Sequence, residues 1–157
     1  MSSTQRIVQI IFDERTIATR SPQVEHERRI AVYDLVETNH FQPRGDFTGP
    51  FVLHLSAEEG RLTFDVRGEN NDPLTRLTLS LAVLRKVIKD YFLICESYRE
   101  AIKTASPSRI EAIDMGRRGL HNEGAELLRE HLEEKVELDA DTARRMFTLV
   151  CALHLRL

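Results

Sequence analysis

The sequence predicts an α+β fold, with an antiparallel sheet of about four strands in the order β-α-β-β-β followed by three C-terminal α-helices packed on it. Two patterns carry this prediction. Apolar and polar residues alternate in three short segments between residues 51 and 80, which is typical of strands with one buried face. In residues 80–104, apolar residues instead recur in steps of three and four, which is typical of an amphipathic helix.

Length and composition indicate a single α+β domain over residues 1–157. The chain has 157 residues, 41% hydrophobic and 30% charged, so it can bury a sizeable core. Residues 6–79 should form mainly sheet with one inserted helix, and residues 80–157 should be helical. The formal net charge of −3 gives no general attraction to nucleic acid or anionic membranes. Because no signal peptide or membrane-spanning run is recognisable, we expect a cytoplasmic protein that does not bind membranes.

The first half of the chain begins with an apolar strand. Residues 6–13 are rich in β-branched side chains and apolar on both faces, as in a strand with neighbours or cover on either side. Ser21 and Pro22 then have the N-cap and first-turn identities of a helix that should end near Thr38. Proline and glycine residues make residues 39–50 a loop. Three strands joined by tight turns complete a β-meander.

Residues 80–104 should form the central helix, around which the other elements pack. We expect this helix to contact both the sheet and other helices, because additional apolar residues widen its apolar stripe on both sides. It should end near Thr104, since the residue before Pro107 avoids helical geometry. Its apolar positions are Leu81, Leu84, Ile88, Tyr91, Cys95, Tyr98 and Ile102.

Two further helices should follow. Ser108 and Glu111 have the spacing of a capping box, so we expect a helix to start there. Three glycines interrupt its apolar pattern, and the helix is therefore either closely packed at these positions or broken there: Gly116, Gly119 and Gly124. Asp139 or Asp141 should cap the last helix.

Three passages resemble an uncharacterised family of small alphaproteobacterial proteins. The passages are VEHERRIAVYDL at residues 24–35, KDYFLICESYREAI at residues 89–102 and IEAIDMGRRGLHNEGAELL at residues 110–128. The likeness runs over nearly the whole chain. It implies a bacterial cytoplasmic protein but no activity, cofactor or catalytic residue, because that family has no assigned function to carry over.

The strongest candidate site is a polar cluster in residues 114–124. If this segment is helical, Arg117 and His121 share a face, and Asp114 can pair with Arg118 one turn away. Arginine, histidine and asparagine donate hydrogen bonds that suit a phosphate or carboxylate. Arg28, on the inward face of the first predicted helix, is a candidate to converge on the same site. The full candidate set is Asp114, Arg117, Arg118, His121, Asn122, Glu123 and Arg28.

The same cluster has an alternative, structural interpretation. In this interpretation the glycines allow tight helix packing, while Arg117 and Glu123 form ion pairs with neighbouring elements. Arg117 occupies a core-facing position, so its charge needs a partner. The candidates for that partner are Asp114, Glu96 and Glu27.

Neither a metal site nor a cofactor is predicted. Cys95 and Cys151 lie within the apolar patterns of predicted helices, which favours buried thiols over a disulfide or a nucleophile. The histidines outside the cluster lack the spacing of metal ligands, as at His54, His131 and His154.

These observations predict a non-catalytic regulatory or adaptor protein that recognises another macromolecule through residues 114–124. A protein partner is expected rather than nucleic acid, because the acidic stretch 123–137 repels a phosphate backbone. The alternative is an enzyme acting on a phosphorylated or RNA substrate, with His121 as acid or base and Arg117 or Arg118 as anion clamp.

Two further alternatives stay open. The arginine–histidine pair is similar to the signature of HEPN ribonucleases, although its spacing is shorter and the predicted meander departs from their all-helical fold. A homodimer could also form if the glycine-rich helix packs against its own copy.

Overall fold

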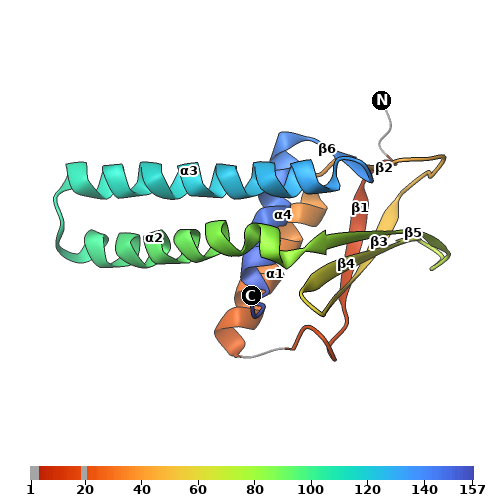
Figure 1. Cartoon of the computed structure of the whole chain (residues 1–157), viewed down its shortest axis with the longest axis horizontal. Coiled ribbons are helices and arrows are strands. Elements are labelled where there is room, and N and C mark those ends of the chain that lie inside the picture. The colour runs from red at the N-terminus through yellow and green to blue at the C-terminus, as the bar shows by residue number, and fades with distance from the viewer. Residues whose placement is uncertain (1–3, 19–20) are drawn as a thin grey trace.

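The structure is a computed structural model that describes residues 4–18 and 21–157. It confirms the α+β class, with one helix after the first strand and three helices at the C-terminal end (Figure 1). The elements in chain order are β1 (Ile7–Phe12), α1 (Pro22–Glu37), β2 (Phe41–Pro43), β3 (Phe51–Glu58), β4 (Arg61–Gly68), β5 (Pro73–Ser80), the 3₁₀ turn η1 (Leu81–Leu84), α2 (Arg85–Thr104), α3 (Pro107–Leu132), β6 (Val136–Leu138) and α4 (Ala140–Ala152). None of the helices in the described part of the chain has the length and apolar character needed to cross a membrane.

The main sheet is mixed, so the prediction of a purely antiparallel sheet is wrong. Its strand order is β1-β3-β4-β5, and the predicted meander forms two antiparallel pairs. The first strand instead runs parallel to β3, with Ile10 opposite Leu53. Helix α1 and the segment after it carry the chain back across the molecule, so β3 starts at the same end of the sheet as β1. The alternation of apolar residues is the same for either direction and does not reveal it.

A second, two-stranded sheet was not predicted: one of its strands lies in residues 39–50, which were predicted as a loop, and the other in residues 80–157, which were predicted to be helical. Strands β2 and β6 pair antiparallel, with Phe41 opposite Leu138. Each strand has three residues, which is too short for an alternating pattern to be recognised. Residues 39–50 are therefore not entirely loop.

Side chains cap the N-termini of three helices, α1, α3 and α4. The hydroxyl of Ser21 and the carboxylate of Asp139 each accept a hydrogen bond from a backbone N–H in the first turn of α1 and α4. This confirms the predicted cap at Ser21 and identifies Asp139 as the cap among the two candidates, Asp139 and Asp141. Helix α3 starts two residues earlier than the predicted capping box, which placed the N-cap at Ser108. Its N-cap is Ser106, and Pro107 occupies the first helical position, where a missing N–H costs nothing.

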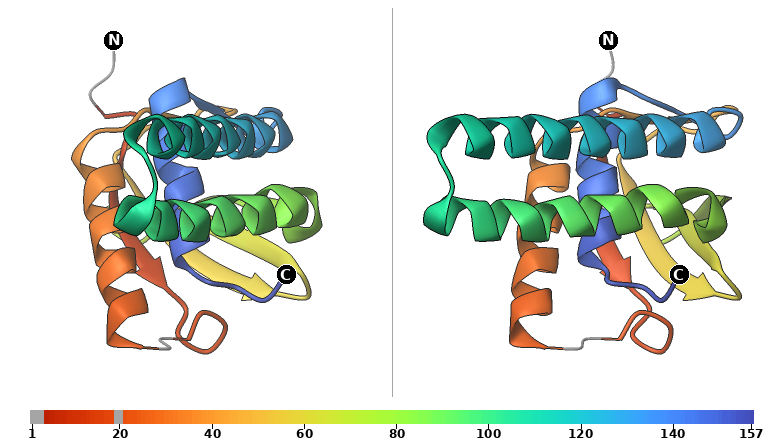
Figure 2. Two further views of the ribbon diagram at one scale, coloured as in Figure 1. Left: turned by 90° about the vertical axis from the view of Figure 1, so that its left-hand side faces the viewer. Right: turned by 60° about the vertical axis from the view of Figure 1, so that its left-hand side comes forward.

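Helices α2 and α3 form an antiparallel helical hairpin that extends well beyond the sheet, while α1 and α4 lie side by side and the hairpin crosses α4 (Figures 1 and 2). Residues 80–104 are therefore not the central helix, because only Val87, Ile88 and Ala101 of α2 are buried. The core helix is α4, which has eight buried residues. The apolar stripe of α2 continues along its outer half, where only α3 covers it.

Helix α3 is continuous through its glycines, and two of them are sites of close packing. A β-carbon at Gly116 would lie 2.8 Å from Cδ1 of Ile94, and one at Gly124 would lie 2.2 Å from Cζ of Phe147. Both glycines thus face side chains of the same chain. Gly119 is exposed and has open space around it, so of these three it is the one a second copy could approach.

Substitution of Gly124 tests this packing. We expect Gly124→Ala to lower the free energy of unfolding by about 1–3 kcal/mol, because the fully buried ring of Phe147 would have to shift to make room for the new β-carbon. Gly119→Ala is the matched control, and it should raise the free energy of unfolding by about 0.5–1 kcal/mol because the exposed helix interior favours alanine. Urea denaturation followed by circular dichroism measures both, and equal effects would contradict the proposed packing.

Candidate functional site

The polar cluster of residues 114–124 lies at the middle of α3, where the helical hairpin crosses α4. An open cavity of about 520 Å³ is found there, and we call it the arginine pocket. Three helices line it with Tyr91 from α2, with Arg117, Arg118, His121 and Asn122 from α3, and with Arg144 and Thr148 from α4. None of these lining residues carries a carboxylate.

Arg117 is held in place by two neighbours on the hairpin. Its Nε lies 3.1 Å from a carboxylate oxygen of Asp114, and the central carbon of its guanidinium lies 5.0 Å from the ring centre of Tyr98. The hydrogen bond from Arg117 to Asp114 raises the pKa of the arginine. Asp114 is therefore the partner of Arg117 among the three carboxylates that the sequence offered.

The other two arginines reach further into solvent. Nε of Arg118 lies 3.3 Å from the second oxygen of Asp114, so one carboxylate serves two guanidinium groups at the predicted spacing. The side chain of Arg118 is 64% exposed, and that of Arg144, which pairs with Asp141, is 44% exposed. Two carboxylates thus balance three guanidinium groups, which leaves a positive charge in excess at the pocket.

His121 is fixed by rings and by one hydrogen bond. Its ring packs edge-on against those of Tyr91 and Phe147, with centroids 5.4 and 5.2 Å apart. Nε2 lies 2.7 Å from the hydroxyl oxygen of Thr148, and that hydroxyl donates to the carbonyl of Arg144. Nε2–H of His121 must therefore be the donor, which leaves Nδ1 as the acceptor.

The charge state of His121 follows from its surroundings. Burial lowers the pKa of His121, and the nearby positive charges of Arg144 and Arg117 lower it further. The imidazole is therefore neutral at neutral pH. It acts as a rigid, uncharged wall of a pocket whose charge comes from the arginines.

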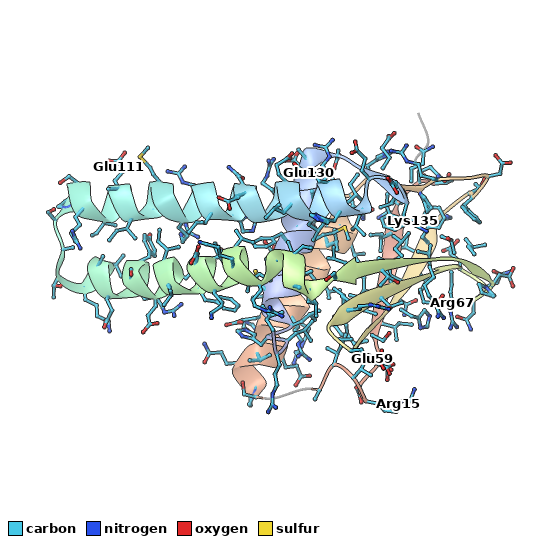
Figure 3. The ribbon with its side chains drawn as sticks, viewed as in Figure 1. Arg15, Glu59, Arg67, Glu111, Glu130 and Lys135 are labelled. Carbon is cyan, nitrogen blue, oxygen red and sulfur yellow. The ribbon has the colours of Figure 1, made fainter. Side chains whose placement is uncertain are left out.

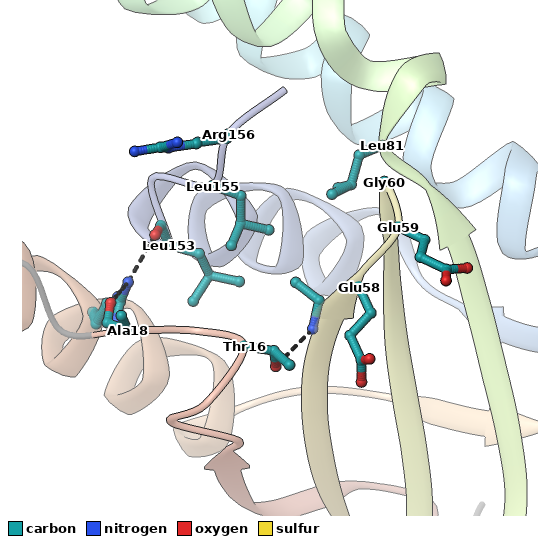
Figure 4. A pocket seen from close by; sticks show the side chains of 11 residues that line it. Thr16, Ala18, Glu58, Glu59, Gly60, Leu81, Leu153, Leu155 and Arg156 are labelled. Atoms are coloured by element: carbon teal, nitrogen blue, oxygen red, sulfur yellow. Dashed lines mark hydrogen bonds between the residues drawn. The ribbon is translucent and has the colours of Figure 1, made fainter.

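Three candidate residues do not line the arginine pocket: Arg28, Glu123 and Asp114, of which Asp114 still pairs with Arg117 and Arg118. Arg28 is buried, and its guanidinium donates hydrogen bonds of 2.8 Å to the backbone carbonyls of Ala18 and Leu153, beside a separate cavity (Figure 4). The inward face of α1 meets the end of α4 there, so Arg28 does not converge with the arginines of α3. Glu123 is exposed and does not line the pocket.

Sequence reasoning missed the contributions of α2 and α4. Arg144 and Thr148 are one turn apart beside the apolar band of α4, so their shared face could have been recognised. That this face meets His121 depends on how α4 crosses the hairpin, which no local pattern reports. Tyr91 was assigned to the apolar stripe of α2, and it does pack on Phe147, with ring centroids 5.9 Å apart.

The structure leaves both cysteines as thiols. Cys95 and Cys151 are not disulfide-bonded, and burial raises the pKa of Cys151 to about 12, which keeps it protonated. Within residues 4–18 and 21–157, no group of three or more His, Cys, Asp or Glu side chains is placed to hold a metal ion.

The titration of His121 tests this description of the pocket. We expect an NMR titration to place its pKa below the ordinary value of 6.5, and Arg144→Ala to raise that pKa only part of the way back, because burial remains. At a pH between the pKa of His121 in the folded protein and its ordinary value in the unfolded chain, the unfolded chain binds more protons than the folded one. The free energy of unfolding should therefore fall as the pH is lowered through this window. A pKa at or above 6.5 would contradict the structure.

Comparison with known proteins identifies the relatives of this chain. Residues 4–156 match the model of an uncharacterised protein family, UPF0262. A UPF0262 protein of Azorhizobium caulinodans is 58% identical over 151 residues, covering 95% of this chain and 93% of the relative. Another from Paramagnetospirillum magneticum is 55% identical over 156 residues, covering 99% of both chains.

The likeness noted in the sequence is confirmed by these matches. A third relative, from Rhodospirillum rubrum, is 54% identical over 156 residues, covering 99% of this chain and 96% of the relative. No solved structure matches the chain. The chain therefore belongs to the uncharacterised protein family UPF0262.

Proposed function

We propose that this protein is a non-catalytic regulatory or adaptor protein that binds an anionic group of a protein partner in the arginine pocket. The observation that carries the proposal is the lining of this pocket, which has three arginines and no carboxylate. Guanidinium groups bind phosphoryl and carboxylate groups through paired, charge-assisted hydrogen bonds. We place this activity in the cytoplasm, where the two unpaired thiols suit a reducing environment.

The three arginines suit different parts of such a task. Arg117 is held by Asp114 and Tyr98, so it presents a charge whose position is already fixed. The guanidinium groups of Arg118 and Arg144 are more exposed and can turn toward a bound anion. An anion would also offset the excess positive charge that Asp114 and Asp141 leave unbalanced.

An enzyme acting on a phosphorylated or RNA substrate is the second candidate. The lowered pKa of His121 favours it, because a neutral imidazole can accept a proton through Nδ1. Recognition is the better supported function for two reasons. Nε2 of His121 already donates to Thr148, and the ring is positioned by aromatic contacts instead of by a carboxylate that would stabilise its protonated form.

A native pull-down from bacterial lysate tests recognition. We expect the wild-type protein to retain a protein partner, identified by mass spectrometry, and the folded Arg118→Ala, Arg144→Ala double variant to lose it. Loss of one charged hydrogen bond costs about 1.5–3 kcal/mol, so each substitution should weaken binding about 10- to 100-fold. Arg29→Ala is the matched control, since Arg29 is 73% exposed and ion-paired to Glu25 on α1.

The other outcomes of this experiment separate the alternatives. A partner kept equally by wild type and double variant would show that the arginine pocket is not the recognition surface. Recovery of RNA, with a cleavage activity that His121→Gln abolishes, would support the enzyme instead. Loss of the partner by Arg29→Ala as well would indicate a nonspecific charge effect.

A further inference from the structure

A second cavity, of about 780 Å³, lies between α1 and α2, with α4 at its base. We call it the α1–α2 groove. Its walls present apolar side chains from two helices, namely Val24, Ile30 and Ala31 from α1 and Tyr91, Phe92 and Cys95 from α2. The base is formed by α4, including Cys151 and Ala152.

The groove leaves apolar surface uncovered on both of its walls. Ile30 is 49% exposed on α1, and Phe92 is 37% exposed on α2. A single exposed apolar residue needs no explanation, but two on facing walls of one cavity define a site for apolar side chains. The ring of His154 stacks on Phe92 with centroids 5.5 Å apart, which holds that wall in place.

The charged residues of the groove are mainly acidic. Glu27 and Asp34 line the α1 wall, and Glu96 lines the α2 wall. Arg99 is the one arginine or lysine among the described residues that line the groove. Nε2 of His154 lies 2.9 Å from a carboxylate oxygen of Glu27. The α1 wall thus carries two carboxylates, and on the α2 wall Glu96 is accompanied by Arg99. The groove combines an apolar base with a lining that is negative overall, the opposite of the arginine pocket.

We propose that the α1–α2 groove binds a basic amphipathic helix of a partner protein. The apolar stripe of that helix would pack against Ile30 and Phe92, and its lysine or arginine side chains would face Asp34 and Glu96. Helices form both walls and the base, so no free strand edge is present for an extended peptide to pair with. The acidic rim disfavours nucleic acid and anionic lipid as occupants.

This inference does not rest on the arginine pocket. The two cavities share Tyr91 and Thr148 at their boundary but differ in every charged residue that lines them. Substitutions on one side therefore leave the charges of the other unchanged, and the two proposals can fail separately.

The test uses a synthetic amphipathic peptide and the full chain. The peptide has about 18 residues, with a leucine stripe at helical spacing flanked by lysines. A control peptide, the acidic peptide, has glutamates in place of the lysines. Binding is measured by calorimetry, and NMR shifts of the labelled protein locate it. We expect the basic peptide to change the chemical shifts of Ala31, Cys95 and Ala152, and we expect no comparable binding of the acidic peptide.

A substitution that adds positive charge to either wall should weaken this binding. Ile30→Lys and Glu96→Lys, at positions outside the buried core, should each reduce affinity at least about tenfold. Matched controls are Ile11→Lys, at a strand position 38% exposed, and Glu111→Lys, on the side of α3 that points away from α2 (Figure 3). Both controls should bind as wild type, and so should Arg118→Ala. Circular dichroism confirms that every variant is folded.

Four results would overturn the proposal. Chemical-shift changes located outside the groove would place the peptide elsewhere. Equal binding of the acidic peptide would show that the negative charge of the groove does not select the partner. Equal losses in the control variants would show that the peptide responds to total charge alone. Concentration-dependent shifts of the groove residues without peptide would assign the groove to a second copy of this chain instead.

Discussion

The close contact between Phe147 and Gly124 joins the helical hairpin to the rest of the molecule. A β-carbon at Gly124 would lie 2.2 Å from the ring of Phe147, so the hairpin can cross α4 at this distance only because residue 124 has no side chain. Tyr91 and His121 pack edge-on around the same buried ring. Three helices thus meet at one aromatic side chain, and Tyr91, which packs on it, lines both cavities.

A second set of contacts places α1 against the core. The side chain of Asn39 accepts a hydrogen bond from the backbone N–H of Ile7 and donates to the carbonyls of Ile7 and Leu35, which ties the end of α1 to β1. The buried hydroxyl of Thr142 accepts from the backbone N–H of His40 and ties the same region to α4. These bonds satisfy backbone groups that helix and sheet leave open, and they determine where α1 stands as a wall of the groove.

The two cavities are lined by charges of mainly opposite sign. Arginines from α3 and α4 line one cavity, whereas carboxylates from α1 and α2 line the next, and the chain carries a formal net charge of −3 overall. Charge of either sign placed on one face contributes more to the orientation and specificity of a partner than to affinity. The boundary between the two faces runs through Tyr91 and Thr148, which line both cavities.

Part of the candidate site could be predicted because it depends on one helix. The pairing of Asp114 with Arg118 follows from their spacing along α3, and the same spacing places Arg117 and His121 on one face. Arg28 could not be placed in this way. It lies on another helix, and its helical position shows only that its side chain points toward the core. The position does not show which part of the core the side chain reaches.

The sequence by itself determined the elements that depend on nearby residues: the meander, the three C-terminal helices and the cap at Ser21, and it limited the cap of α4 to Asp139 or Asp141. Only the tertiary structure decided that β1 runs parallel to β3, that α4 is buried instead of α2, and that Arg144 joins the cluster on α3. The physical reason is the range of the forces involved. Capping bonds and apolar periodicity act over a few residues, whereas strand direction and helix crossing depend on contacts between segments far apart in the chain.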